Sequence, residues 1–510
     1  AGYTVGAISG IVTYYGDGSG LSGTGFTQDD QGNLVAGTGA GPASDNTDTI
    51  YNVSIGCNAG ANLTTGDCNT FIGHNAGRYS TTSGLQVYIG RDAGKMHRDN
   101  QHYNIAIGYN AYSTGNNSTS QDNVFIGRHA GKWGIGDSNI AMGVMSAACQ
   151  TLGDHNIAMG QCALVGSATT TNNQGSHNTA MGYFAGMSLT SGDNNILLGC
   201  NAGTTITDGA YNVAIGAGAG QNIGHCSGCD DNVYIGRLTG ACNRGSKNVA
   251  LGCCAMRGSN TVDNNSGYRN VVLGMDAAKS LTSGSQNVII GESAGCGCEL
   301  SGNHNVLLGS RAGEHLTSGC MNTFIGYDVG GDGIITGKQN VVIGGWMAGY
   351  KLTSGQYNLF LGGCAGRYST SGSDNIAMGR CTMGGADVTG DYNIAFGMCS
   401  GKVITSGHTN ILIGKGAGCC VTTGCYNVAI GKDVQLPSAT GSCQLAIGYG
   451  NTTWISGDLN FNVGIGTTNF DAPVGSAITA KTYVGILSAY QLYGDGSNLT
   501  GAGFSPDADE

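Results

Sequence analysis

A short alternation of mostly apolar and variable positions recurs along most of this chain. Each copy reads Asn, apolar residue, any residue, usually Ile, Leu or Met, and then Gly, as in Asn52–Gly56, Asn104–Gly108 and Asn212–Gly216. Successive copies most often lie about 17 residues apart, a spacing typical of repeat proteins. In all, 24 copies can be counted, the last at Asn462–Gly466. Because successive side chains of a β-strand point to opposite faces, the pattern predicts one very short strand in every copy.

A second half-motif follows the strand in many copies. It consists of Ala-Gly and then Leu-Thr-Ser-Gly, as in Ala185–Gly192 and Ala348–Gly355. Glycine at fixed offsets supplies the positive φ that tight turns require. A repeat this short cannot bury an apolar face alone, whereas stacked neighbours can. We therefore predict an all-β fold, a parallel β-roll or β-solenoid of about 24 short coils over residues 50–466. Residues 1–49 and 467–510 are predicted to be connectors.

The residue that opens each copy is predicted to stack on its equivalents. Equal positions of parallel coils lie about 4.7–4.8 Å apart, so an amide side chain can hydrogen-bond to the next one along the stack. The opening residue is Asn in 22 copies, and Gln86 and Gln444 replace it in the other two. The alternative is that Asn only begins a turn. The predicted ladder includes Asn52, Asn69, Asn104, Asn212 and Asn427.

The middle position of the strand is also mostly apolar. It holds Ala106, Ala214 and several aromatic residues such as Phe71 and Tyr88, and none of the copies has a charge there. A strand that is apolar on both faces is usually buried on both faces. One face can fill the coil, and a thin single-chain coil offers nothing to cover the other. We predict that chains intertwine or lie side by side through the middle residues, so that aspartate at Ala214 would abolish assembly.

Composition narrows the classes of function. Of the 510 residues, 94 are Gly and 4 are Pro, charged residues make up 10%, and the net charge is −11. A nucleic-acid surface needs clustered Lys and Arg, so nucleic acid is not predicted as a partner. No apolar stretch approaches the length of about 18 residues that a membrane span needs, and no span is predicted. An apolar share of 40% is enough for a buried core.

No pattern of catalytic residues is recognisable. The ten His residues are scattered, and no nucleophile elbow or phosphate-binding loop occurs. We predict a protein that is not an enzyme and has no catalytic residue, metal or cofactor. The best metal candidate is His225 with Cys226 and Cys229, which could instead form a strained disulfide or a packed turn.

The 20 Cys residues admit two interpretations. A secreted disulfide framework is one of them, but the low density of Cys along a long chain favours mostly free thiols. Cys364, Cys381 and Cys399 each lie two residues after a repeat Gly in consecutive copies. They are predicted to form a stacked column, as thiols or as one disulfide and a remaining thiol.

Two coils are lengthened by insertions at residues 167–175 and 259–267. Insertions in solenoids map to surface loops, which often form the binding face. Loops rich in Asn, Thr and Ser can hydrogen-bond to sugar hydroxyls, although any tolerated loop has a similar composition. The receptor-binding candidates are Thr169, Thr170, Thr171, Asn172, Asn173, Asn260, Asn264 and Asn265.

The repeat resembles two families of fibrous protein. Asn104–Ala111 and its equivalents are similar to the head repeats of trimeric bacterial adhesins of the YadA type, although the unit here is longer. The resemblance to tail-fibre proteins of marine tailed phages, especially cyanophages, is closer. Asn462–Asn469 looks like a motif that closes such arrays, with Phe470 where Pro is usual. A fibre module also occurs twice, because Tyr15–Phe26 and Tyr493–Phe504 match at 9 of 12 positions; convergent Gly-rich turns are the alternative.

The resemblance implies a homotrimer that acts as a structural segment of a phage tail fibre. Such a segment lies on the outside of the virion and takes part in host attachment. Its partners would be copies of itself, other tail-fibre segments and a host surface glycan or protein. The main alternative is a trimeric adhesin fibre on a bacterial cell surface. An ice-binding solenoid with stacked Thr and a glycan-degrading spike enzyme are weaker alternatives, because unit lengths vary and no carboxylate pair is evident.

Overall fold

The computed structural model covers most of the repeat array, and the chain divides into two units. The described residues are 27–42, 48–97, 101–114, 120–134, 136–149, 153–167, 173–222, 229–258, 265–460, 462–466 and 482–484. The units comprise residues 1–338 and 339–510. The described residues form an all-β parallel β-solenoid of about 22 turns without a helix. None of them forms a helix long and apolar enough to cross a membrane.

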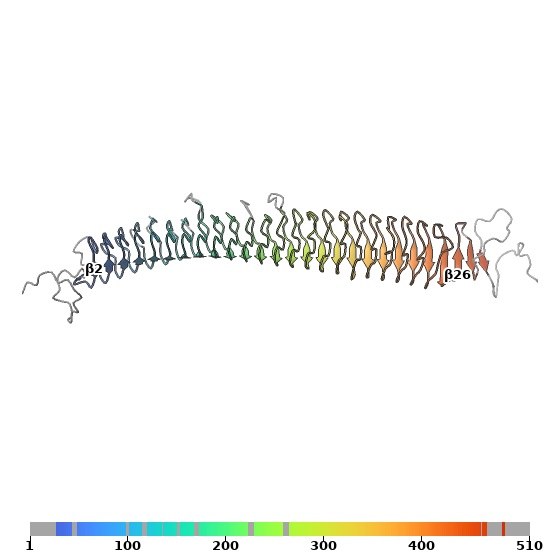
Figure 1. Ribbon diagram of the computed structural model, residues 1–510, viewed down its shortest axis with the longest axis horizontal. Helices are drawn as coiled ribbons and strands as arrows, with labels where there is room; N and C mark the ends of the chain where they lie inside the picture. Colours follow the sequence, from blue (N-terminus) through green and yellow to red (C-terminus); the bar gives the residue numbers. More distant parts are fainter. Residues whose placement is uncertain are drawn as a thin grey trace, which may run out of the picture. The chain divides into compact units, whose positions relative to one another are not determined.

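The first unit is a stack of coils that each contribute one strand. Strand β1 pairs antiparallel with β2, and strands β2 to β18 then pair parallel in order, ending with the pair β17–β18 (Figure 1). The strands are β1 Thr27–Gln28, β2 Leu34–Ala36, β3 Val53–Ile55, β4 Thr70–Ile72, β5 Val87–Ile89, β6 Ile105–Ile107, β7 Val124–Ile126, β8 Ile140–Met142, β9 Ile157–Met159, β10 Thr179–Met181, β11 Ile196–Leu198, β12 Val213–Ile215, β13 Val233–Ile235, β14 Val249–Leu251, β15 Val271–Leu273, β16 Val288–Ile290, β17 Val306–Leu308 and β18 Thr323–Ile325.

The second unit continues the same construction and then changes strand direction. Strands β19 to β25 pair parallel in order, β25 to β27 pair antiparallel, and β27 pairs parallel with β28. The strands are β19 Val341–Ile343, β20 Leu359–Leu361, β21 Ile376–Met378, β22 Ile394–Phe396, β23 Ile411–Ile413, β24 Val428–Ile430, β25 Leu445–Tyr449, β26 Thr452–Gly457, β27 Val463–Ile465 and β28 Thr482–Val484.

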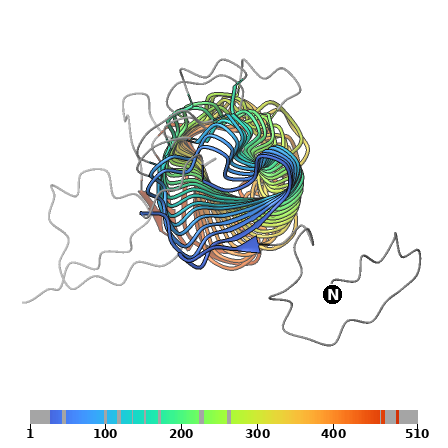
Figure 2. The same cartoon turned by 90° about the vertical axis from the view of Figure 1, so that its left-hand side faces the viewer.

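The pairing register follows the repeat in the sequence. In β11 and β12, Ile196, Leu197 and Leu198 face Val213, Ala214 and Ile215, so equal repeat positions lie side by side. Figure 2, seen from the N-terminal end, shows the coils of the first unit superposed on one another. The prediction of a parallel β-solenoid is confirmed.

The middle residue of each strand points into its own coil. Leu197 is fully buried, together with Ala202 of the Ala-Gly motif, and Ile206 is 2% exposed. Ala214 is 1% exposed for the same reason. The prediction that the middle residues face another chain is therefore wrong, because these side chains fill the interior of a single chain. The flanking strand positions are the ones that face outward, and Ile196 is 42% exposed.

A hydrogen-bonded ladder of asparagines runs along the coils of each unit. In its centre, Nδ2 of Asn195 donates to Oδ1 of Asn178 at 3.0 Å and to the carbonyl of Gly209 at 2.9 Å. The backbone nitrogen of Asn195 also donates to Asn178, and Asn212 donates in the same way to Asn195. Each asparagine thus joins the start of its strand to the closing turn of its coil and to the coil before it. The backbone nitrogen likewise donates to the side-chain amide oxygen of the preceding ladder residue in Asn52, Asn69, Asn104, Asn212 and Asn427.

The ladder begins on an aspartate instead of an asparagine. Asn33 opens the coil of β2, and its backbone nitrogen and Nδ2 donate to the two carboxylate oxygens of Asp29 at 2.8 and 2.9 Å. Asn52 then donates to Asn33 and β2 pairs parallel with β3, so the ladder and the parallel stack begin within the region predicted to be a connector.

The last predicted copy is not a further coil of this stack. Asn462 donates its backbone nitrogen and Nδ2 to Asp458 at 3.0 and 2.9 Å, and β27 pairs antiparallel with β26. This correction has a physical cause, because the β25–β26 hairpin occupies the edge on which another parallel strand would pair. Asn462 instead repeats the arrangement of Asn33 and starts a new parallel pair.

The glycine that ends each strand is required by the close stacking of the backbones. Gly199 has φ +135°, and a Cβ there would lie 2.6 Å from the carbonyl oxygen of Gly216. We expect Gly199→Ala to lower the free energy of unfolding by about 2–4 kcal/mol, because neighbouring backbones must separate. Gly450→Ala is the control, since Gly450 also has positive φ but has no atom within 4 Å of that position. Chemical denaturation compares them, and equal losses would contradict the steric explanation.

Candidate functional site

The outer face of the strands exposes apolar side chains that the described part of the chain does not cover. In β23, Ile411 and Ile413 are 38% and 37% exposed, whereas Leu412 between them is fully buried. In β22, Ile394 and Phe396 are also exposed. Contiguous apolar surface of this kind marks an interaction site in soluble proteins. The outer strand positions are thus the candidate contact surface for another chain.

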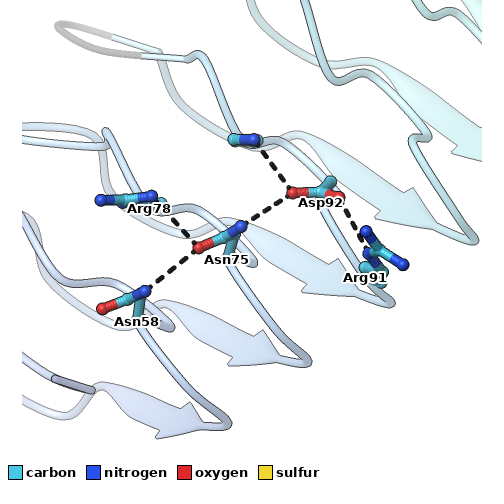
Figure 3. A network of polar contacts seen from close by, with 6 residues as sticks. Asn58, Asn75, Arg78, Arg91 and Asp92 are labelled. Carbon is cyan, nitrogen blue, oxygen red and sulfur yellow. Dashed lines mark hydrogen bonds and ion pairs between the residues drawn. The ribbon is translucent and has the colours of Figure 1, made fainter. Parts of the chain in front are cut away.

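Polar side chains at the turn after the strand form a second ladder near the start of the first unit (Figure 3). Asn58 donates to Asn75 at 3.4 Å, and Asn75 donates to Asp92 at 3.0 Å. Arg91 and Lys95 form ion pairs with Asp92 at 3.3 and 3.2 Å. Burial acts to raise the pKa of Asp92, but the hydrogen bonds and the two cations together lower it. The polar groups of these residues therefore bond to one another across neighbouring coils, and we interpret this second ladder as structural.

The predicted receptor-binding residues fall into two sets. Thr169, Thr170, Thr171, Asn172, Asn260 and Asn264 lie outside the described residues. Asn173 and Asn265 are fully buried, and their Nδ2 atoms donate to the carbonyls of Cys149 and Cys242 at 2.6 and 3.0 Å. These two amides hold the base of each loop and do not face a receptor.

Most described cysteines are free thiols. Cys364, Cys381 and Cys399 occupy equal positions in consecutive coils and are half-buried and unpaired by disulfides. Burial raises the pKa of Cys381, which disfavours a reactive thiolate. Cys229 is disulfide-bonded. His225 and Cys226 of the zinc candidate lie outside the described residues, and within the described part no group of three or more His, Cys, Asp or Glu could hold a metal.

A buried aromatic cluster fills one stretch of the first unit. His97 is fully buried and stacks on Tyr112 with ring centroids 3.5 Å apart, beside Tyr88. Burial lowers the pKa of His97 to about 3, so the ring is neutral at physiological pH. None of these three residues lines a hollow among those described, so we interpret the cluster as part of the core.

The neutral state of His97 makes stability pH-dependent. The unfolded chain takes up a proton near pH 6.5, whereas the folded chain does so only near pH 3. Stability should therefore fall as the pH drops below 6.5, by about 1.4 kcal/mol per pH unit. Denaturation at pH 7 and 4.5 measures the loss. We expect His97→Leu to remove most of this pH-dependent loss of stability, and His304→Asn, at an exposed turn, to retain it. If both variants lose the same stability in acid, His97 is not the cause.

A row of exposed tyrosines lies immediately before the asparagine ladder in the second unit. Tyr357, Tyr392 and Tyr426 are 48%, 60% and 57% exposed and occupy alternate coils, with Asp374 and Thr409 in the coils between. All five residues have φ between +56° and +59°. Each from Asp374 onward donates its backbone nitrogen to the preceding coil at 2.9–3.1 Å. The row is therefore held in register by the solenoid.

An open hollow of about 420 Å³ lies on this row. Tyr392, Thr409 and Tyr426 line it together with Asp391 and His408. The ring of His408 meets Tyr426 edge to face, with centroids 5.1 Å apart, and its Nδ1 is 3.2 Å from Oγ1 of Thr409. The hollow thus combines aromatic faces with hydroxyl, imidazole and carboxylate groups.

Thr409 has an unusual backbone for its residue type. Left-handed φ costs about 1–2 kcal/mol for a non-glycine residue, and it is rarest for β-branched ones. Among the described non-glycine residues with positive φ, Thr409 is the one β-branched residue. The row was not predicted from the sequence, although the alternate tyrosines before Asn358, Asn393 and Asn427 are a visible signal.

Comparison with known proteins gives no assignment. The chain matches no family model and no curated protein.

Proposed function

We propose that this chain is a structural segment of a homotrimeric fibre, in the tail fibre of a tailed phage, and that it takes part in attachment to the host surface. The observation that supports this most is the apolar outer face of the strands. Each strand of the stack has two outward positions, and in β23 these hold Ile411 and Ile413, each of which is more than one-third exposed. A molecule that repeats such a surface on coil after coil is suited to lateral association along its length.

The energetics favour association of whole chains. Covering a one-third-exposed Ile or Val contributes about 0.5–1 kcal/mol, because complete burial contributes about 1.5–3 kcal/mol. Association of proteins costs about 4–15 kcal/mol in lost freedom and ordering. A few coils cannot offset that cost, whereas the outer residues of β19 to β25 and their equivalents in the first unit can. The choice of three chains follows from the resemblance to trimeric fibres.

The two ladder starts support a place within a longer fibre. Asp29 with Asn33, and Asp458 with Asn462, make the same pair of side-chain hydrogen bonds. In each case an antiparallel pair of strands precedes a parallel one. A chain that starts a new parallel pair after closing a stack is suited to join segments in series. Other fibre segments are therefore proposed as its partners.

Immunogold electron microscopy tests the location. Antibodies raised against the purified chain are applied to phage particles and to bacterial cells from the source sample. The proposal predicts gold along the tail fibres of virions. Gold on bacterial envelopes, with unlabelled particles, would contradict it and favour a bacterial surface adhesin.

A further inference from the structure

We propose that the tyrosine row Tyr357, Tyr392 and Tyr426 binds an extended, neutral, β-1,4-linked glycan that runs along the coils. This inference deepens the attachment role proposed above by naming a ligand class and a site. The two can fail separately, because gold labelling reports location and a titration reports glycan binding.

The spacing of the tyrosines along the row matches the repeat of an extended β-1,4-linked glycan. Adjacent coils lie about 4.8 Å apart, so tyrosines on alternate coils lie about 9.5 Å apart. One coil spacing is close to the length of one sugar unit in an extended chain. In a β-1,4-linked chain, alternate sugars present the same face to one side. Tyr392 and Tyr426 would then meet sugars of equal orientation, with Thr409 opposite the sugar between them.

The side chains that line the hollow are of the kinds that bind sugars. An aromatic face packs against the C–H face of a sugar ring, and both Tyr392 and Tyr426 expose more than half of their surface. Ligand sites combine such faces with a few polar groups that fix orientation. The hydroxyl of Thr409, the imidazole of His408 and the carboxylate of Asp391, one oxygen of which already accepts from the backbone nitrogen of Ser373 at 2.7 Å, supply donors and acceptors for sugar hydroxyls.

The charge of the site decides between neutral and anionic glycans. Asp391 lines the hollow, and Asp374 lies in the row between Tyr357 and Tyr392. The residues that line the hollow include no Lys or Arg. Carboxylates without a compensating cation repel an anionic sugar and accept hydrogen bonds from neutral ones. The site is therefore suited to glucose or N-acetylglucosamine units.

The backbone of Thr409 gives an independent reason to expect a function here. The other described coils whose equivalent residue has positive φ carry no β-branched side chain at this position. Strain of this kind clusters at binding sites, where surrounding structure holds it in place. Thr409 lines the hollow together with the two tyrosines, and its hydroxyl, which pairs with Nδ1 of His408, has capacity for a second hydrogen bond to a ligand there.

Isothermal titration of the full chain with β-1,4-linked hexasaccharides of glucose and of N-acetylglucosamine tests the proposal. We expect at least one of them to bind, and Tyr392→Asn or Tyr426→Asn to weaken that binding about tenfold. Asn suits the left-handed backbone, so these variants should remain folded. Tyr211→Asn is the matched control, because Tyr211 has the same repeat position and is 60% exposed but has no tyrosine two coils away.

Two comparisons complete the test. An α-1,4-linked glucose hexasaccharide, which coils instead of extending, and an anionic alginate hexasaccharide should bind at least tenfold more weakly. The proposal is overturned if neither β-1,4-linked hexasaccharide binds, if the α-linked or anionic chain binds equally well, or if Tyr211→Asn weakens binding as much as Tyr392→Asn.

Discussion

Asn195→Leu should lower the free energy of unfolding of the coils around it by about 3–6 kcal/mol, because several buried polar groups lose their partners at once. Leucine removes the acceptor used by two nitrogens of Asn212 and the donor to Gly209 and Asn178. Each buried group left without a partner costs about 1–3 kcal/mol. Chemical denaturation followed by circular dichroism measures the effect.

Asn195→Gln is the matched control for that variant. The natural ladder already accepts glutamine, because Gln86 donates its backbone nitrogen to Asn69 and accepts from Asn104 at 3.1 Å. We expect the glutamine variant to lose less than about 2 kcal/mol, since its amide keeps both roles. If Leu and Gln destabilise the chain equally, the side-chain ladder does not hold the coils together.

Charged substitutions on the outer and the inner face of strand β23 should have opposite effects on association and folding. Ile411→Glu with Ile413→Glu should leave the coil folded and weaken association, because the charges lie in water on a single chain but would be desolvated between chains. The expected result is a larger share of folded single chain of 51.4 kDa at low protein concentration than the natural chain gives. Mass measurement in solution, with circular dichroism as the test of folding, checks both parts.

Leu412→Glu gives the opposite result. Leu412 is fully buried between those two isoleucines, so a charge there lies inside the coil and should cost about 4 kcal/mol or more. Ala214→Asp also places a charge inside the coil, so its expected outcome is loss of folding and not loss of assembly alone. A double-glutamate variant at Ile411 and Ile413 that associates as tightly as the natural chain would show that the outer face is not the contact surface.

The sequence pattern predicts the coil, its period and the stacking of equal positions, because all three follow from the repeat itself. It cannot decide which face of the strand is inside. Both faces are apolar, so an alternation of period two has no polar side to mark the exterior. A usable signal was present in the Ala-Gly motif: a Cβ at Gly94 would lie 2.3 Å from the ring of Tyr88. A bulky middle residue therefore requires the glycine across the interior.

The ends and the candidate glycan site were harder to predict. Asp29 and Asp458 look like ordinary turn residues, and their role is evident only when the first asparagine of a ladder lacks a predecessor. The tyrosine row is visible in the sequence, but its exposure and left-handed backbone follow from the folded coil. Of the receptor-binding candidates in the insertions, Asn173 and Asn265 are buried anchors, and the other six lie outside the described residues.

The mass of the intact chain in solution shows whether the chain associates as a trimer. Light scattering coupled to size-exclusion chromatography gives it without a variant or a ligand. A trimeric fibre gives a single species with three times the mass of the 51.4 kDa chain. A well-folded, soluble monomer of 51.4 kDa would contradict it, because the apolar outer face would then be stable in water without a partner.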